Sequence, residues 1–177
     1  MIRTVEERVV YRNQYVTVFD DLVEFPDGST GTYIRMRWTA PFGVAVVPVI
    51  GDAVLLIRLF RYAERCWSTE IPQGFGMDGA DPAAEALREL AEETGLEASA
   101  VEPLLNFGSE YVTYGFLAKI PGGAAPHSRR LERTESINSF SRMPIAEINS
   151  ASIASAGIRD ANTIALLFAA RERFEET

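Results

Sequence analysis

Four glutamates lie close together between residues 85 and 93, and their spacing suggests a site for a cation. Glu85, Glu89, Glu92 and Glu93 flank a single arginine, Arg88. On a helix that turns by roughly 100° per residue, the four carboxylates fall on an arc of about 100°. Unit charges about 4 Å apart repel by on the order of 1 kcal/mol in water and about 4 kcal/mol at an intermediate dielectric. A bound divalent cation would offset this repulsion, whereas the alternative is a solvated acidic helix face.

The residues around the cluster predict where this helix begins and ends. Asp81 before Pro82 favours a start, because Asp caps free backbone N–H groups and Pro loses no hydrogen bond at the first helical position. Gly95 favours a stop, because glycine enters the left-handed cap conformation without strain. The side opposite the carboxylates is predicted to pack against a core, with the two leucines as its large residues: Ala83, Leu87, Leu90, Ala91 and Thr94.

The loop before the helix, residues 71–76, would place backbone carbonyls beside the carboxylates. It reads Ile-Pro-Gln-Gly-Phe-Gly. Hard oxygen ligands that converge from a helix and a loop suit Mg²⁺ or Mn²⁺, usually held together with substrate phosphates. The loop therefore favours a metal site over a solvated face.

Residues 74–96 resemble the signature box of the Nudix hydrolases. That box reads Gly, five residues, Glu, seven residues, then Arg-Glu-aliphatic-x-Glu-Glu-x-Gly-aliphatic. The matching positions are Gly74, Arg88, Glu89, Leu90, Glu92, Glu93, Gly95 and Leu96. The first glutamate of the box is missing, because residue 80 is alanine. The match implies the Nudix fold, and Ala80 leaves open whether the domain catalyses or only binds a nucleotide.

Other segments are similar to the ADP-ribose pyrophosphatase branch of the family. They are the strand-rich N-terminus, Leu-Phe-Arg-Tyr-Ala at 59–63, Glu-Ile-Pro at 70–72 and Asp-Ala-Asn-Thr at 160–163. In that branch the N-terminal strands cross over to the partner of a homodimer and help to form the site. Two departures, Gln73 where alanine is usual and a short proline-free loop at 107–111, shift the expectation from ADP-ribose itself to nucleoside diphosphate sugars as a class.

The resemblance implies hydrolysis of a diphosphate bond with Mg²⁺ or Mn²⁺ as cofactor, and it assigns roles by position. Glu89 and Glu93, one turn apart, correspond to metal ligands. Glu92 completes the cluster and is also a catalytic candidate, and the carbonyl of Gln73 is a further candidate ligand.

Substrate contacts are expected from Arg61 and Glu70. Arg61 matches a substrate-binding arginine of the branch, although a surface arginine at a strand end is an equal alternative. Glu70 is expected beside the metal or on the substrate side. Arg35 and Arg37 are weaker candidates for a second substrate arginine, because the alignment there slips by one residue.

The loop near residues 121–134 is where the family often carries its general base. Glu132 and Glu135 are the candidates, and Glu135 is favoured because a strand pattern resumes at Ile137 and Phe140. A second acidic position of the loop is occupied by Arg133 in the preferred alignment. The nearby basic residues are either a solvated loop or phosphate contacts: His127, Arg129, Arg130 and Arg133.

Ala80 also predicts a local rearrangement. In the family pattern the missing glutamate pairs with the box arginine. Arg88 must therefore find another acid, and the expected partners are Asp78, Asp81, Glu92 or Glu70.

Length and composition predict one soluble enzyme-sized domain preceded by a small β-subdomain. The chain has 177 residues with 47% apolar and 24% charged residues, which fits a single core. Its formal charge of −8 argues against nucleic acid as a partner. A single cysteine, Cys66, and the absence of an apolar signal or membrane segment lead to the expectation of a cytoplasmic protein that does not bind membranes.

The pattern of apolar residues predicts an α/β/α sandwich with a mixed sheet. Strands are expected at 9–11, 15–19 and 32–34 in an N-terminal β-subdomain, residues 1–40, that is expected to be a dimerisation element. Residues 41–177 are expected to form the hydrolase domain, with strands at 43–50, 53–57 and 112–117. A last helix should open at Asp160 and pack through Ile164, Leu166, Leu167 and Phe174.

Overall fold

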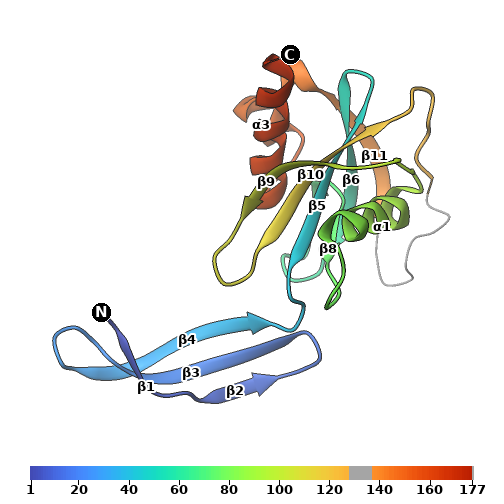
Figure 1. Ribbon diagram of the computed structural model, residues 1–177. Helices are drawn as coiled ribbons and strands as arrows, with labels where there is room; N and C mark the ends of the chain where they lie inside the picture. The colour runs from blue at the N-terminus through green and yellow to red at the C-terminus, as the bar shows by residue number, and fades with distance from the viewer. Residues whose placement is uncertain (128–136, 177) are drawn as a thin grey trace.

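The computed structural model describes residues 1–127 and 137–176, and its strands form two separate sheets (Figure 1). The N-terminal sheet contains β1 (Arg3–Glu6), β2 (Val9–Arg12), β3 (Val16–Glu24) and β4 (Thr30–Trp38). The larger sheet contains β5 (Gly43–Ile50), β6 (Ala53–Arg61), β7 (Cys66–Glu70), β8 (Gln73–Phe75), β9 (Glu102–Phe107), β10 (Thr113–Ile120) and β11 (Ile137–Pro144). The helices are α1 (Pro82–Thr94), the 3₁₀ helix η1 (Ile145–Glu147), α2 (Ser150–Ser155) and α3 (Ala161–Glu175).

The larger sheet is mixed, as predicted. Its strand order is β11-β6-β5-β10-β9, with β7 added beside β6 and β8 beside β5. β5 and β10 run parallel, and the other pairs are antiparallel. Every residue of β5 is buried, because this strand lies inside the sheet and both of its faces are covered.

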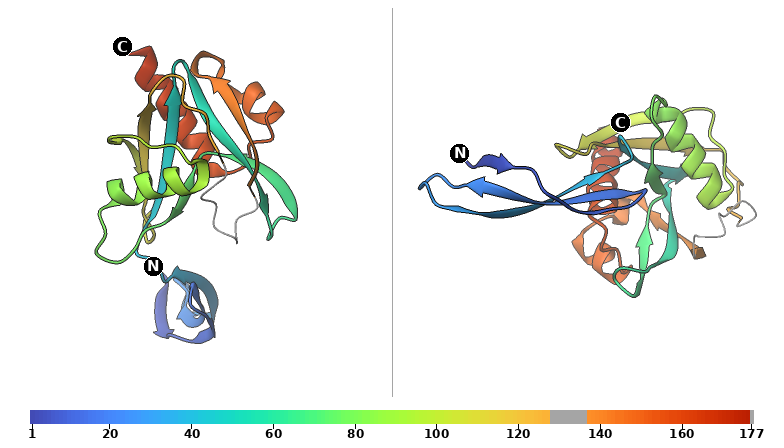
Figure 2. Two further views of the ribbon diagram at one scale, coloured as in Figure 1. Left: turned by 90° about the vertical axis from the view of Figure 1, so that its right-hand side faces the viewer. Right: turned by 90° about the horizontal axis from the view of Figure 1, so that it is seen from below.

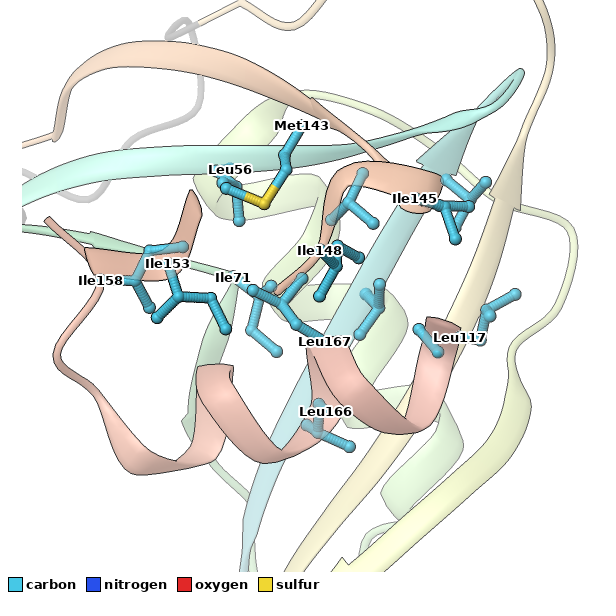
Figure 3. Packing of buried hydrophobic residues seen from close by; sticks show 14 of the residues in the cluster. Leu56, Ile71, Leu117, Met143, Ile145, Ile148, Ile153, Ile158, Leu166 and Leu167 are labelled. Atoms are coloured by element: carbon cyan, nitrogen blue, oxygen red, sulfur yellow. The ribbon is translucent and has the colours of Figure 1, made fainter. Parts of the chain in front are cut away.

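Helices cover both faces of this sheet, which confirms the predicted α/β/α sandwich (Figure 2). Since side chains alternate along a strand, successive residues of β5 enter different cores. Val44 and Val46 pack with Leu90 of α1, whereas Ala45 and Val47 join the core that holds α3. Figure 3 shows this second core, in which Ile71, Leu117, Leu166 and Leu167 lie close together with residues from η1 and α2.

The strands predicted from apolar runs are present, usually with longer bounds. β6, for example, continues to Arg61, four residues beyond the predicted segment. Short or polar strands were not predicted: β1, β7, β8 and β9. The last helix begins after Asp160, which caps Thr163, and Leu166 and Leu167 are fully buried as expected. Phe174 was expected on the packed side but is 36% exposed, because it lies in the last turn of α3.

The N-terminal sheet projects from the rest of the molecule in all three views (Figures 1 and 2). β3 is its central strand, with β1 and β2 end to end along one edge and β4 along the other. One face is covered by its own side chains, since Phe19 is fully buried beneath the guanidinium of Arg35 at 3.7 Å from the ring centroid. In the part of the chain that the structure describes, no helix is long and apolar enough to cross a membrane.

Candidate active site

Helix α1 carries the glutamate cluster and has the predicted ends. The carboxylate of Asp81 accepts a hydrogen bond from the amide of Ala83 at 3.4 Å, and Pro82 is the first helical residue. Gly95 adopts φ 68° at the C-terminal cap, in the left-handed region that favours glycine. The helix therefore fixes the spacing of the glutamates.

The buried side of α1 includes glutamates, which corrects the predicted packing side. Ala86 and Leu90 are fully buried, whereas Leu87 is only half-buried. Glu85, Glu89 and Glu93 are 5%, 7% and 2% exposed. The helix is thus rotated about its axis relative to the prediction, so that part of the carboxylate arc is buried against β8.

Strand β8 explains this rotation, because it gives Glu89 a place against the backbone. A Cβ atom at Gly74 would lie closer than 3.0 Å to the carboxyl carbon and both carboxylate oxygens of Glu89. Gly74 pairs with Val44 of the buried strand β5, so its backbone is fixed by the sheet. The missing side chain of Gly74 therefore creates the space that the Glu89 carboxylate fills.

Gln73 connects the second metal candidate to the strands. Its backbone N–H donates to Glu93 at 3.1 Å. Its side-chain amide donates to Glu70 at 2.6 Å and accepts from Asn162 at 2.9 Å. Gln73 thereby ties β8 to α1, to β7 and to the start of α3.

These residues fit a divalent cation by their donor chemistry, although their side chains are engaged with one another. Within residues 1–127 and 137–176, no three acidic, histidine or cysteine side chains converge as a formed metal cage. Arg88 holds Glu89 and Glu92, and the amide of Gln73 holds Glu93. Three carboxylates next to a loop backbone nevertheless supply the hard oxygen ligands that Mg²⁺ and Mn²⁺ prefer.

Arg88 is the centre of the carboxylate cluster. It forms ion pairs with Glu89 and Glu92 at 2.6 Å each and with Glu85 at 3.0 Å. The predicted pairing with Glu92 is confirmed, whereas Glu85 and Glu89 were not expected as partners. Burial alone would lower the pKa of Arg88, but its bond to Glu85 and the charges of Glu89 and Glu92 raise that pKa.

Arg61, the last residue of β6, and Glu70, the last residue of β7, form a second charged group. Arg61 donates to Glu70 from Nε at 2.9 Å and also from Nη2, in a two-pronged contact. The Glu70 side chain is 2% exposed and that of Arg61 is 40% exposed. Burial alone would raise the pKa of Glu70, but the hydrogen bonds and charge of Arg61 hold that pKa below its ordinary value. Glu70 thus lies behind Arg61 and orients it.

One cavity of about 470 Å³ brings most of these residues together. Its lining consists of Gly43, Val44, Arg61, Gln73, Gly74, Phe75, Arg88, Glu89, Glu92, Tyr111, Thr113 and Asn162. Cationic and anionic groups therefore face the same space. Glu70 and Glu93 lie beneath this lining and contact it through Arg61 and Gln73.

Aromatic side chains form one side of this cavity. Phe75 and Tyr111 line it, and Trp38 at the end of β4 contacts both, with ring centroids 5.3 Å and 6.2 Å away. Burial raises the pKa of Tyr111 to about 12. Its hydroxyl is buried and has no hydrogen-bond partner among the described residues. An apolar platform with one polar group therefore stands beside the charged groups.

Several candidates lie elsewhere. Arg35 pairs with Asp21 and Glu7 in the N-terminal sheet, and Arg37 lies over Phe19. The backbone amide of His127 donates to Thr94, and its ring packs against Gly95 at the end of α1. The remaining loop candidates lie outside the described residues: Arg129, Arg130, Glu132, Arg133 and Glu135.

Sequence reasoning did not assign a role to five residues of the site. Glu85 was counted in the acidic arc, and its position three residues before Arg88 was a usable signal for pairing. Asn162 stood in a segment that matched the family. Trp38, Phe75 and Tyr111 come from three distant segments, and no spacing in the sequence connects them.

Comparisons with protein families match two parts of the chain. Residues 39–167 match the NUDIX domain, and residues 2–33 match the nucleoside diphosphate sugar hydrolase N-terminal domain. The first match covers most of the chain and includes every residue that lines the cavity.

Two relatives and one solved structure show what the chain is similar to. A CMP-5'-(N-acetyl-N-hydroxy-3-aminopropyl)phosphonate hydrolase of Streptomyces rubellomurinus is 36% identical over 103 residues, which cover 57% of this chain and 48% of that protein. An ADP-sugar pyrophosphatase of Mus musculus is 37% identical over 87 residues, covering 44% and 40%. The chain thus spans about half the length of these relatives. A crystal structure of an ADP compounds hydrolase shares the fold, with a TM-score of 0.80, 23% identity and coverage of 99% and 95%.

Proposed function

This chain belongs to the Nudix family, and we propose that it is a divalent-metal-dependent hydrolase of a nucleoside diphosphate linked to another group. The bond cleaved is the diphosphate, and the substrate class is ADP-ribose or another nucleotide sugar. The observation that carries this proposal is one cavity lined by acidic Glu89 and Glu92, cationic Arg61 and aromatic Phe75 and Tyr111. The glutamates suit a metal ion, the arginine suits a diphosphate, and the aromatic rings suit a nucleobase.

Glu89, Glu93, Glu92 and the carbonyl of Gln73 are the proposed holders of Mg²⁺ or Mn²⁺. Such a cation, when bound, lowers the pKa of water and screens the phosphate charges. Glu92, whose side chain is 31% exposed in the cavity, is a proposed catalytic group that accepts a proton. Glu135 is the second proposed catalytic group, and it lies outside the described residues.

Arg61 is proposed to bind the diphosphate. Its side chain is 40% exposed at the cavity, and Glu70 fixes the guanidinium from the buried side. The N–H groups that are not directed at Glu70 can meet anionic oxygens, and a guanidinium fork suits phosphate geometry. Glu70 supports substrate binding through this orientation.

The aromatic platform is proposed to hold the nucleobase. Stacking of a base on an aromatic ring contributes about 1–3 kcal/mol and tolerates different bases. The names of the relatives point to both CMP-linked and ADP-linked compounds, so the platform supports a nucleoside without selecting its base.

A nucleotide panel with a metal titration tests the function. Purified protein is incubated with ADP-ribose, ADP-glucose, a CMP-linked compound and UDP-glucose, and a phosphatase converts the phosphomonoester products to inorganic phosphate. We expect Mg²⁺-dependent phosphate release from at least one compound and none in excess EDTA. The alternative is a degenerate domain that binds nucleotides only, as Ala80 suggests. Thermal stabilisation by a nucleotide with no release in Mg²⁺ or Mn²⁺ would establish that alternative.

We also propose that residues 1–40 form a dimerisation element. Side chains at alternate positions of β3 and β4 form an apolar face opposite Phe19 and Arg35. On this face Ile34 is 72% exposed, Met36 50% and Trp38 36%. A small sheet with one uncovered apolar face is marginal alone. Because Trp38 contacts Phe75 and Tyr111, a second copy of the chain on this face would lie next to the cavity.

A charge placed on this face should separate the dimer. Wild-type protein is expected to scatter light as twice the 19.6 kDa protomer at micromolar concentration. Met36→Glu should scatter as a monomer, because a carboxylate would be buried without a partner in the interface. Tyr33→Glu is the matched control, since Tyr33 is exposed on the same strand but on the other face. A monomeric wild type, or a dimeric Met36→Glu protein, would contradict the proposal.

A further inference from the structure

One nitrogen of Arg88, Nη2, lies near more hydrogen-bond acceptors than it has protons to donate. Its Nη2 lies 2.6 Å from Glu89, 3.0 Å from Glu85 and 3.2 Å from the carbonyl oxygen of Phe75. A guanidinium nitrogen of this type carries two protons. The three acceptors therefore share Nη2, while Nη1 serves Glu92 at 2.6 Å.

Glu85 differs from the other two carboxylates in its position. Glu89 and Glu92 line the cavity with Arg88, but Glu85 does not. Its side chain is 6% exposed, and it accepts from both Nε and Nη2 of Arg88, at 3.2 Å and 3.0 Å. A buried carboxylate needs such a partner. Glu85 therefore holds Arg88 from the side that faces away from the cavity.

We propose that Glu85 is a positioning residue that keeps Arg88 in place when a divalent cation takes Glu89 and Glu92. This inference rests on the proposed function, since it requires a cation at those carboxylates. The cation and Arg88 compete for the same oxygens. With Glu85, Arg88 retains one carboxylate and the Phe75 carbonyl after Glu89 and Glu92 are withdrawn. Without Glu85, only Glu89 and Glu92 would balance the charge of Arg88. A cation would then take these two carboxylates from Arg88 less readily.

Ala80 gives this role its context. The box that residues 74–96 resemble has its first glutamate in the loop, at the position of Ala80. Here an acid within α1, three residues before Arg88, provides the carboxylate instead. The link from Arg88 to the Phe75 carbonyl joins α1 to β8, so the same contact also orients the cavity wall.

Titration of the protein with Mn²⁺ alone, followed by electron paramagnetic resonance of the free ion, tests the proposal without activity. We expect Glu85→Gln to weaken Mn²⁺ binding about tenfold, which corresponds to about 1.4 kcal/mol. Glu175→Gln is the matched control, because it removes a carboxylate that pairs with Arg171 on α3, away from the cavity. It should bind Mn²⁺ like the wild type. Equal affinity of the Glu85→Gln and wild-type proteins would overturn the proposal.

A double-mutant cycle separates action through Arg88 from a simple loss of negative charge. In an Arg88→Gln background, Glu85→Gln should change Mn²⁺ affinity less than twofold, because the competitor is gone. A tenfold loss in both backgrounds would show that Glu85 acts by its charge alone and would overturn the positioning role.

Circular dichroism checks that each variant is folded. If Glu85→Gln is not, Glu85→Asp replaces it, with about threefold weaker binding expected and unchanged binding counting against the proposal. Failure of the wild type to bind Mn²⁺ would instead refute the proposed metal dependence.

Discussion

Glu89→Gln is expected to reduce turnover at saturating Mg²⁺ by about a thousandfold, or about 4 kcal/mol of transition-state stabilisation. The amide keeps the size of the side chain but removes the charge that a metal ligand requires. Glu89 lies between α1 and β8, where its carboxylate packs on Gly74 and lines the cavity. The three atoms nearest to a Cβ at Gly74 all belong to this carboxyl group.

The same substitution should leave the fold intact. Three glutamates pair with one arginine in this part of α1, so removing one negative charge reduces repulsion among the rest. The melting temperature is therefore expected to stay equal or rise slightly. Glu102→Gln is a suitable control for charge loss, because Glu102 is exposed on β9 and pairs only with Lys119 in the described hydrogen bonds. Wild-type turnover in Glu89→Gln would remove Glu89 from the proposed metal ligands.

Local signals in the sequence predicted the helix ends and the central strand well. Asp81, Pro82 and Gly95 act through their own backbone and side-chain chemistry, which does not depend on distant partners. The apolar run of β5 predicts a strand covered on both faces, because burial on both sides removes the usual alternation. Such features can be read from a few neighbouring residues.

The site depends on contacts that a local pattern does not contain. Leu87 was predicted to pack and Glu85 to lie on the opposite side of the helix, but the space left by Gly74 accommodates a carboxylate, and Glu85, Glu89 and Glu93 are all buried. Arg61 and Glu70 meet because β6 and β7 lie side by side and the long arginine side chain reaches along them, since Glu70 itself is opposite Ile57. The resemblance identified both residues but not that one orients the other.

Gly74→Ala is expected to lower turnover about a hundredfold, or about 3 kcal/mol, through one added methyl group. The new Cβ would overlap the Glu89 carboxylate, so that side chain must leave its place between α1 and β8. Gly74 is not among the glycines with positive φ, so alanine adds no backbone strain there. Overpacking of this kind also destabilises by about 1–3 kcal/mol. Mn²⁺ affinity should fall together with turnover.

Gly122→Ala is the matched control, because a Cβ at Gly122 meets no atom within 4 Å and Gly122 also lacks a positive φ. It should keep wild-type turnover and Mn²⁺ affinity. Because Gly74→Ala acts by displacing Glu89, the double variant with Glu89→Gln should be no slower than Glu89→Gln alone. If the two losses instead multiply, Gly74 contributes to catalysis by a route other than the space it leaves for Glu89. Normal turnover in Gly74→Ala would show that the Glu89 carboxylate works equally well in another position.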